Sequence, residues 1–153
     1  MLSVWWDTEG IVHWELLPEG TTITADVYCE QLERVKEALA MNRPHREKVL
    51  LLHDNATPHT ARRTKRKLEE LGWEILPHAP YSPDTAPTDF KLFLSLHNAL
   101  RGLEFKTMEE IHAFIADFFA SKSAGFFVRG FTALPERWKE VIKCGGDYSA
   151  DLD

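Results

Sequence analysis

An uninterrupted apolar run at residues 49–52, Val-Leu-Leu-Leu, constrains the fold more than any other feature of this sequence. Four apolar residues without a polar alternate are typical of a central strand that is covered on both faces, as in α/β proteins. The run ends in His53, Asp54 and Asn55, where such a strand would leave the core. Because α/β proteins place ligands beyond the carboxyl ends of these strands, Asp54 is a candidate functional carboxylate.

The segments around this run predict further strands and helices. Residues 2–6 and 11–17 are rich in β-formers and flank a polar turn at residues 7–10, which predicts a hairpin whose more apolar face carries Val12, Trp14 and Leu16. Residues 25–40 repeat apolar side chains at helical spacing after Thr24. A helix over residues 58–71, opened by Thr57-Pro58 and closed by Gly72, precedes a short strand at residues 73–76.

The second half of the sequence predicts helices only. Residues 77–87 are rich in proline, and Pro87 can open a helix that ends at Gly102 and has Asp89 in its first turn. Its apolar face would comprise Phe90, Phe93, Leu94, His97 and Leu100. Thr107 and Glu110 form a capping box for a helix whose inner face would be Ile111, Phe114, Ile115 and Phe118. A last helix from about Pro135 would carry Trp138, Val141 and Ile142 and stop at Gly145-Gly146.

This order of elements predicts an α/β fold with a mixed sheet and helices packed on it. The length of 153 residues fits one domain. No stretch approaches the roughly 18 apolar residues of a membrane span, so we expect no membrane partner. The two cysteines, Cys29 and Cys144, fit neither a disulfide framework nor a zinc site, and we expect reduced thiols.

The net charge of −6 argues against general nucleic-acid binding, because phosphate contacts come from Lys and Arg. Any contact with DNA must therefore be local. One cluster of cations is dense enough to provide it, comprising Arg62, Arg63, Lys65, Arg66 and Lys67. Such a run is also typical of a solvated helix face, and both interpretations stay open from the sequence.

Several other residues have more than one interpretation. Asp54 could be a turn former and Asp89 a simple first-turn acid favoured by the helix dipole. A zinc cluster of His53, His59 and His78 with Asp54 is disfavoured, because no spacing fixes three of them on one element. Residues 81–84 predict a turn that leads to Asp89. A set of aromatic residues at helical spacing is better interpreted as core than as base-stacking surface, namely Phe114, Phe118, Phe126, Phe127 and Trp138.

Taken together, two segments resemble the central signature of mariner-type transposases of the Tc1/mariner superfamily. They are residues 53–61, His-Asp-Asn-Ala-Thr-Pro-His-Thr-Ala, and residues 76–90, Leu-Pro-His-Ala-Pro-Tyr-Ser-Pro-Asp-Thr-Ala-Pro-Thr-Asp-Phe. In that family 34 residues separate the second and third catalytic acids, and residues 55–88 provide that number here. The resemblance extends to Val-Trp-Trp-Asp at residues 4–7 and Leu-Pro-Glu-Arg-Trp at residues 134–138.

The resemblance implies an RNase H-like fold and a DDE-type nuclease that cuts and pastes DNA at terminal inverted repeats. It implies that Asp54 and Asp89 are catalytic acids and ligands of Mg²⁺ or Mn²⁺, supported by His53, Asn55 and His59. Two hard cations roughly 3.5–4 Å apart can activate the nucleophile and stabilise the leaving oxygen, and carboxylates suit them. Transposon and target DNA would be the partners, in the nucleus, with a homodimer as one assembly to test and with no small-molecule substrate.

The sequence also departs from the family pattern. The family's first acid lies upstream in a Gly-Asp-Glu context that these residues do not contain, and Asp7 belongs to the hairpin turn and does not replace it. We therefore expect an N-terminally truncated catalytic domain, without its first strand and helix-turn-helix domains, and with impaired cleavage. The alternative function is a non-catalytic remnant that binds DNA or a transposase partner. Nothing resembles a SET domain, so we expect no methyltransferase activity.

Overall fold

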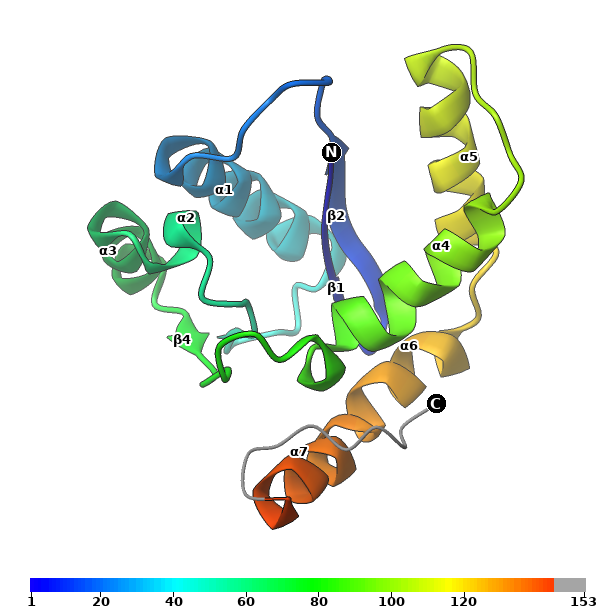
Figure 1. Ribbon diagram of the computed structural model, residues 1–153. Helices are drawn as coiled ribbons and strands as arrows, with labels where there is room; N and C mark the ends of the chain where they lie inside the picture. Colours follow the sequence, from blue (N-terminus) through cyan, green and yellow to red (C-terminus); the bar gives the residue numbers. More distant parts are fainter. Residues whose placement is uncertain (145–153) are drawn as a thin grey trace. The chain divides into compact units, whose positions relative to one another are not determined.

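The computed structural model describes residues 1–144, which divide into two compact units (Figure 1). The first unit comprises residues 1–6 and 11–82, and the second comprises residues 7–10 and 83–144. The first contains most of the hairpin strands β1 (Leu2–Asp7) and β2 (Gly10–Leu16), helix α1 (Ala25–Asn42), strands β3 (Leu50–Leu51) and β4 (Glu74–Ile75), and helices α2 (Thr57–Thr60) and α3 (Arg62–Leu71). The second is helical apart from the hairpin tip.

The predicted hairpin is confirmed. Its turn is closed by Asp7, whose Oδ1 accepts hydrogen bonds from the backbone N–H groups of Glu9 (2.8 Å) and Gly10 (3.1 Å). At its open end the Leu17 N–H donates to the carbonyl of Met1. Gly10 has a φ of +130°, a conformation that L side chains rarely adopt. Asp7 therefore has a structural role in the turn.

The polar face of the hairpin is covered by α1. The Glu15 side chain is only 16% exposed, and both Nε of Arg34 and Nε2 of His13 contact its Oε1. Gln31, which is fully buried, donates to Glu15 Oε2 (3.3 Å) and to Ser3 Oγ (3.1 Å). Burial raises the pKa of Glu15, but the hydrogen bonds from Arg34, His13 and Gln31 outweigh it and hold that pKa below its usual value.

This carboxylate should make the stability of the fold depend on pH. Because the folded-state pKa of Glu15 is depressed, its contribution is present above the unfolded pKa of 4.5 and is lost as the pH falls through the folded value. Urea denaturation across this acidic range should show a smaller loss of stability on acidification for Glu15→Gln than for the unsubstituted chain. Glu19→Gln, at an exposed position nearby, is the control and should follow the unsubstituted curve. A Glu15→Gln curve parallel to that curve would contradict the assignment.

The core of the first unit lies between α1, β3 and α3. Its buried members are Tyr28, Leu32, Leu51 and Leu68, and partly buried side chains pack around them, namely Trp5, Ile23, Leu71 and Trp73. Helix α1 begins as predicted, because Thr24 Oγ1 accepts the Val27 N–H. Helices α2 and α3 both lie against α1 (Figure 1). The core thus fixes the loop that leaves β3, which carries Asp54.

The prediction of a single helix over residues 58–71 is wrong, because this segment forms two helices, α2 and α3. Ala61 has φ −56° and ψ 144°, which is extended backbone, and it separates α2 from α3. The hydroxyl of the buried Thr64 in α3 donates a hydrogen bond to the backbone carbonyl of Pro58 in α2. A side chain of one helix therefore satisfies a backbone group of the other across the break. Gly72 ends α3 in the left-handed conformation at φ 69°, as predicted.

The apolar run forms a strand, but it is not covered on both faces. Leu51 is 9% exposed, whereas Leu50 is 52% exposed. β3 pairs in parallel with β4, in the register Leu50 with Glu74 and Leu51 with Ile75. Within residues 1–144 the strands form two separate two-stranded sheets, β1–β2 and β3–β4, and not the single mixed sheet that we predicted. Leu50 stays open because no other described strand is paired with β3.

The second unit contains the 3-10 helix η1 (Pro83–Thr85), the π-helix η2 (Thr88–Phe93) and helices α4 (Leu94–Leu100), α5 (Met108–Ala120), α6 (Ala124–Thr132) and α7 (Leu134–Lys143). The sequence did not predict α6. Thr107 caps α5 as predicted by accepting the Glu110 N–H, but Glu110 Oε2 accepts from Lys106 N–H (2.7 Å) and not from Thr107. The predicted stop at Gly145-Gly146 lies outside the described residues.

The apolar face predicted for the helix after Pro87 is wrong. The buried side chains are Leu92 and Leu96, whereas Leu94 is 55% exposed and His97 is exposed. A π-helix places its hydrogen bonds five residues apart, so residues beyond it no longer follow the α-helical spacing from Pro87. The predicted inner face of α5 is confirmed at Ile115 and Phe118, which are buried.

A helix that crosses a membrane must be both long and apolar. No single helix among residues 1–144 is long and apolar enough to cross one. One pair, α5 with the segment Ala124–Lys143, passes by length and composition together, but it is bent by 80°. The buried Phe118, Phe119 and Phe127 in these helices belong to the core of the second unit.

Candidate functional site

Asp54 lies in the loop that joins β3 to α2. Its side chain is 62% exposed, and Oδ1 accepts hydrogen bonds from the Ala56 N–H (2.9 Å) and from Nδ1 of His59 (2.7 Å). No described residue donates to its other oxygen, Oδ2. One carboxylate oxygen is thus held by the protein, while the other has no donor among the described residues.

The partners of Asp54 favour its charged form. Partial burial raises the pKa of Asp54, but the backbone N–H of Ala56 and the ring of His59 outweigh this effect, and the net pKa lies below its usual value. At neutral pH the group is therefore a carboxylate, the form that coordinates a cation.

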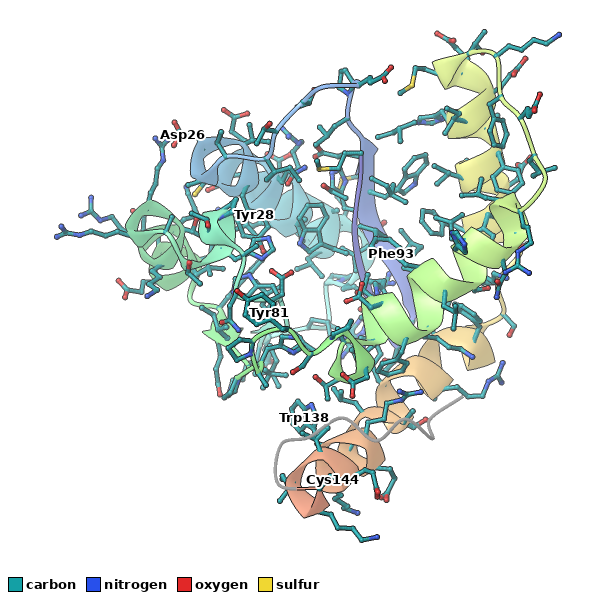
Figure 2. The ribbon with its side chains drawn as sticks, in the orientation of Figure 1. Asp26, Tyr28, Tyr81, Phe93, Trp138 and Cys144 are labelled. Carbon is teal, nitrogen blue, oxygen red and sulfur yellow. The ribbon has the colours of Figure 1, made fainter. Side chains whose placement is uncertain are left out.

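A cluster of aromatic rings supports this loop from the core side. The hydroxyl of Tyr28, labelled in Figure 2, lies 2.8 Å from Nδ1 of His53. The rings of His53 and His59 stack with centroids 4.8 Å apart, and Tyr28 lies 4.3 Å from His59. Burial and, to a smaller extent, the neighbouring His59 lower the pKa of His53 to about 4, so His53 is neutral at physiological pH. His53 and His59 therefore act as supports of the loop.

Tyr28 is a supporting residue that the sequence did not reveal. In the sequence Tyr28 is one of the apolar side chains that recur at helical spacing over residues 25–40, and this pattern assigns it no contact with the Asp54 loop. A buried tyrosine hydroxyl requires a hydrogen-bond partner, and this need is the only sequence signal that could have linked it to a polar loop. Burial and, to a smaller extent, the negative charge of Asp54 raise the pKa of Tyr28, so the hydroxyl keeps its proton.

Asn55 does not contact Asp54 through its amide. Its Nδ2 donates to the carbonyl of His78 (2.8 Å), which ties the loop after β3 to the segment after β4. Nδ1 of His78 is buried and has no hydrogen-bond partner among residues 1–144. Residues 1–144 contain no group of three or more His, Cys, Asp or Glu side chains arranged to hold a metal ion by themselves.

Asp89 lies in the first turn of η2, as predicted, and it is exposed. The N–H groups of Asp89 and Phe90 both donate to the carbonyl of Ala86, at 2.9 and 3.1 Å. The turn before it forms as predicted, with Tyr81 at φ 55° followed by η1. A carboxylate in the first turn of a helix is stabilised by the N–H groups at that end of the helix.

The basic cluster lies on α3, and its cations are of two kinds. Arg63 pairs with Asp26 of α1 (2.7 Å), which Figure 2 labels, and Lys67 pairs with Glu33 (2.8 Å) and Glu70 (3.6 Å). No described acid pairs with the remaining three, Arg62, Lys65 and Arg66. A shallow concavity is lined by Arg62, Arg63, Arg66, Lys67 and Glu70.

Asp54 and Asp89 have the donor type that Mg²⁺ or Mn²⁺ requires. Both are exposed aspartates, and hard cations prefer carboxylate oxygens over nitrogen or sulfur ligands. Asp54 is ionised, and its Oδ2 has no donor among the described residues. In this α/β domain Asp54 follows a strand of a parallel pair, and Asp89 lies at the start of a helix.

Comparison with known proteins identifies the family. Residues 1–49 match the family described as transposase (partial DDE domain). The chain is 43% identical over 152 residues to the mariner Mos1 transposase of Drosophila mauritiana, covering 97% of this chain and 44% of that protein. It is 37% identical over 151 residues to human histone-lysine N-methyltransferase SETMAR, covering 97% of this chain and 22% of that protein.

Solved structures agree with this result. The Mos1 transposase catalytic domain with raltegravir and Mn matches with a TM-score of 0.95 and 43% identity, over 97% of this chain and 76% of that one. A Mos1 paired-end complex with Mn matches with a TM-score of 0.94, over 97% of this chain and 44% of that one. The chain belongs to the mariner transposases and has the RNase H-like α/β fold of their catalytic domain. It spans less than half the length of the curated relatives that it matches.

Proposed function

We propose that this chain carries the DNA cleavage and strand-transfer chemistry of a cut-and-paste transposase, acting on terminal inverted repeats. The observation that carries the proposal is the Asp54 carboxylate in the loop after β3: it is ionised, its side chain is 62% exposed, and the protein holds it through Oδ1 alone among the described contacts. Asp89 is the second proposed ligand of Mg²⁺ or Mn²⁺. Structures of the related Mos1 catalytic domain with Mn and with Mg, and of its paired-end and strand-transfer complexes, support the choice of metal and of DNA as partner.

The residues of this chain have separate tasks in that chemistry. When bound, the cations make the attacking water or 3′-hydroxyl nucleophilic and stabilise the leaving oxygen. Ala56 N–H and His59 hold Asp54 Oδ1, which leaves Oδ2 as the oxygen to face a cation. His53, which is hydrogen-bonded to Tyr28, is neutral and therefore adds no positive charge that would compete with the metal for the Asp54 carboxylate.

The family's first acid is not among residues 1–153, and we propose that these residues alone cleave DNA poorly, because fewer carboxylates hold the cations less firmly. We also propose action in the nucleus, where transposon and target DNA lie, as a homodimer on paired transposon ends.

The test is cleavage of inverted-repeat DNA by a polypeptide that extends upstream and includes the Gly-Asp-Glu segment. We expect nicking that requires Mg²⁺ or Mn²⁺ and is lost in Asp89→Asn, because the amide carries no charge to hold a cation. Asp117→Asn, at an exposed position of α5, is the control and should keep full activity. Nicking without a divalent cation, or in full strength from Asp89→Asn, would overturn the proposal.

A second candidate function is DNA binding through α3 alone. It is supported by three cations of α3 that have no acidic partner among the described residues, namely Arg62, Lys65 and Arg66. Their spacing of i, i+3 and i+4 places them on one face of the helix. Arg63 and Lys67 are instead held by acids of α1. The three open cations fit the phosphate backbone of DNA, which binds without reading sequence.

Replacing Arg62, Lys65 and Arg66 together by glutamine should weaken DNA binding and its dependence on salt. Each lost phosphate contact lowers the slope of log K against log salt by about 0.9. Fluorescence anisotropy with duplex DNA at several salt concentrations measures both quantities. The control replaces the exposed cations Lys106, Arg129 and Lys143 and removes the same charge. Equal effects of the two triple variants would show that only net charge matters.

A further inference from the structure

The Leu-Pro-Glu-Arg-Trp segment at residues 134–138 has no part in the function proposed above. It forms the start of α7 in the second unit. Within it the half-buried Arg137 makes two contacts with the polypeptide around Asp89. Its Nη1 donates to the carbonyl of Asp84 in η1 (3.2 Å), and its Cζ lies 4.0 Å from the centre of the Phe90 ring in η2.

These two contacts lie on either side of Asp89 in the sequence. Asp84 precedes the turn that leads into η2, and Phe90 directly follows Asp89. The turn is otherwise closed by the Ala86 carbonyl, which accepts from both Asp89 and Phe90. A guanidinium has several donors and a flat face, so one side chain can hydrogen-bond a carbonyl and lie over a ring at once. Arg137 thereby fixes η1 and η2 to each other.

The surroundings of Asp84 add an electrostatic reason for this contact. Its Oδ1 is buried and has no hydrogen-bond partner among the described residues. A buried carboxylate oxygen without a donor is unfavourable unless positive charge lies nearby. Arg137 brings its guanidinium to the same residue, at the carbonyl. A second cation also contacts a ring here, because Lys91 Nζ of η2 lies 4.8 Å from the centre of the Phe126 ring in α6. Cations therefore tie this π-helix to α6 and α7.

We propose that Arg137 is a positioning residue for Asp89: it clamps η1 and η2 from α7 and so holds the Asp89 backbone where its carboxylate can bind a divalent cation. This inference rests on the proposed function in taking Asp89 as a metal ligand. The physical reason is that η2 is a short helical segment that follows a proline-rich turn. Contacts from another helix restrict it.

The first arm of the test follows backbone hydrogen exchange by NMR in the 153-residue chain. Arg137→Gln should speed exchange of the Asp89 and Phe90 amides on the order of ten-fold, because a cation–π contact and a charged hydrogen bond are lost. Arg137→Lys, which keeps a cation and a donor, should restore most of the protection. Arg129→Gln, at an exposed position of α6, should change nothing. Equal rates in Arg137→Gln and Arg129→Gln, or faster exchange throughout α5 as well, would overturn the proposal.

The second arm titrates Mn²⁺ and follows paramagnetic broadening of the Asp89 amide. The Mn²⁺ concentration for half-broadening should rise on the order of ten-fold in Arg137→Gln, as for other residues that orient a metal ligand, and return towards the original in Arg137→Lys. An unchanged titration in Arg137→Gln, with local exchange accelerated, would overturn the positioning role. Absence of broadening at Asp89 in the unsubstituted chain would instead refute Asp89 as a ligand, and the exchange arm would still decide whether Arg137 clamps the segment.

Discussion

Asp54→Ala is expected to reduce Mg²⁺-dependent nicking of inverted-repeat DNA on the order of a thousand-fold or more. The metal stabilises the transition state by several kcal/mol, and each 1.36 kcal/mol corresponds to a factor of ten in rate. Asp54 is the ionised carboxylate at the end of β3, and its alanine variant leaves His59 Nδ1 and the Ala56 N–H without their acceptor. Single-turnover cleavage of a labelled substrate by the upstream-extended polypeptide measures the rate.

The matched control for this experiment is Asp26→Ala. Asp26 is also an exposed acid of the first unit, and its described partner is Arg63 on the surface. Surface ion pairs contribute little, so both folding and cleavage should be retained. Circular dichroism shows whether Asp54→Ala is folded. Full cleavage by a folded Asp54→Ala variant would remove Asp54 from the proposed site.

Leu32→Ala is expected to lower the free energy of unfolding by about 2–5 kcal/mol, the usual cost when a fully buried leucine is truncated and a cavity remains. Leu32 is 0% exposed and packs with Tyr28, Leu51 and Leu68 in the core of the first unit. Because this core also supports the β3 end that leads to Asp54, the substitution made in the upstream-extended polypeptide should abolish cleavage at temperatures where that polypeptide without the substitution still cleaves. Urea denaturation followed by tryptophan fluorescence measures the stability.

Met41→Ala on the same helix is the control for Leu32→Ala. Met41 is 80% exposed near the end of α1, so its truncation removes little buried surface. Its stability should stay within about 0.5 kcal/mol of the original. If both variants lost similar stability, the burial of Leu32 in the core would not explain the effect.

Local signals in the sequence were sufficient for the hairpin and for most helix ends. Asp7 closes the hairpin turn, Thr24 and Thr107 cap their helices, and Gly72 ends α3, all as predicted. Each of these features depends on a hydrogen bond or a backbone angle within a few residues. The spacing of the motifs likewise indicated the mariner family, and the similarity to Mos1 in sequence and fold confirmed it.

Other features depended on contacts between distant residues, and the sequence misled there. The break at Ala61 is accompanied by a hydrogen bond from the buried Thr64 to Pro58, and Leu50 is exposed because no described strand other than β4 pairs with β3. The π-helix at Asp89 shifted the buried face to Leu92 and Leu96. Periodicity assumes one regular helix or a fully covered strand, and neither assumption held.

For the candidate site, the sequence alone indicated which acids to consider, because Asp54 and Asp89 occupy a strand end and a helix start within a family signature. Only the tertiary structure revealed the contacts around these acids. His59 and the Ala56 N–H hydrogen-bond one oxygen of Asp54, and Tyr28 hydrogen-bonds His53. Arg137 lies over the ring of Phe90, next to Asp89. A residue's type and its neighbours along the chain fix its chemistry and local backbone. Its hydrogen-bond partners and burial instead depend on which distant segments pack beside it.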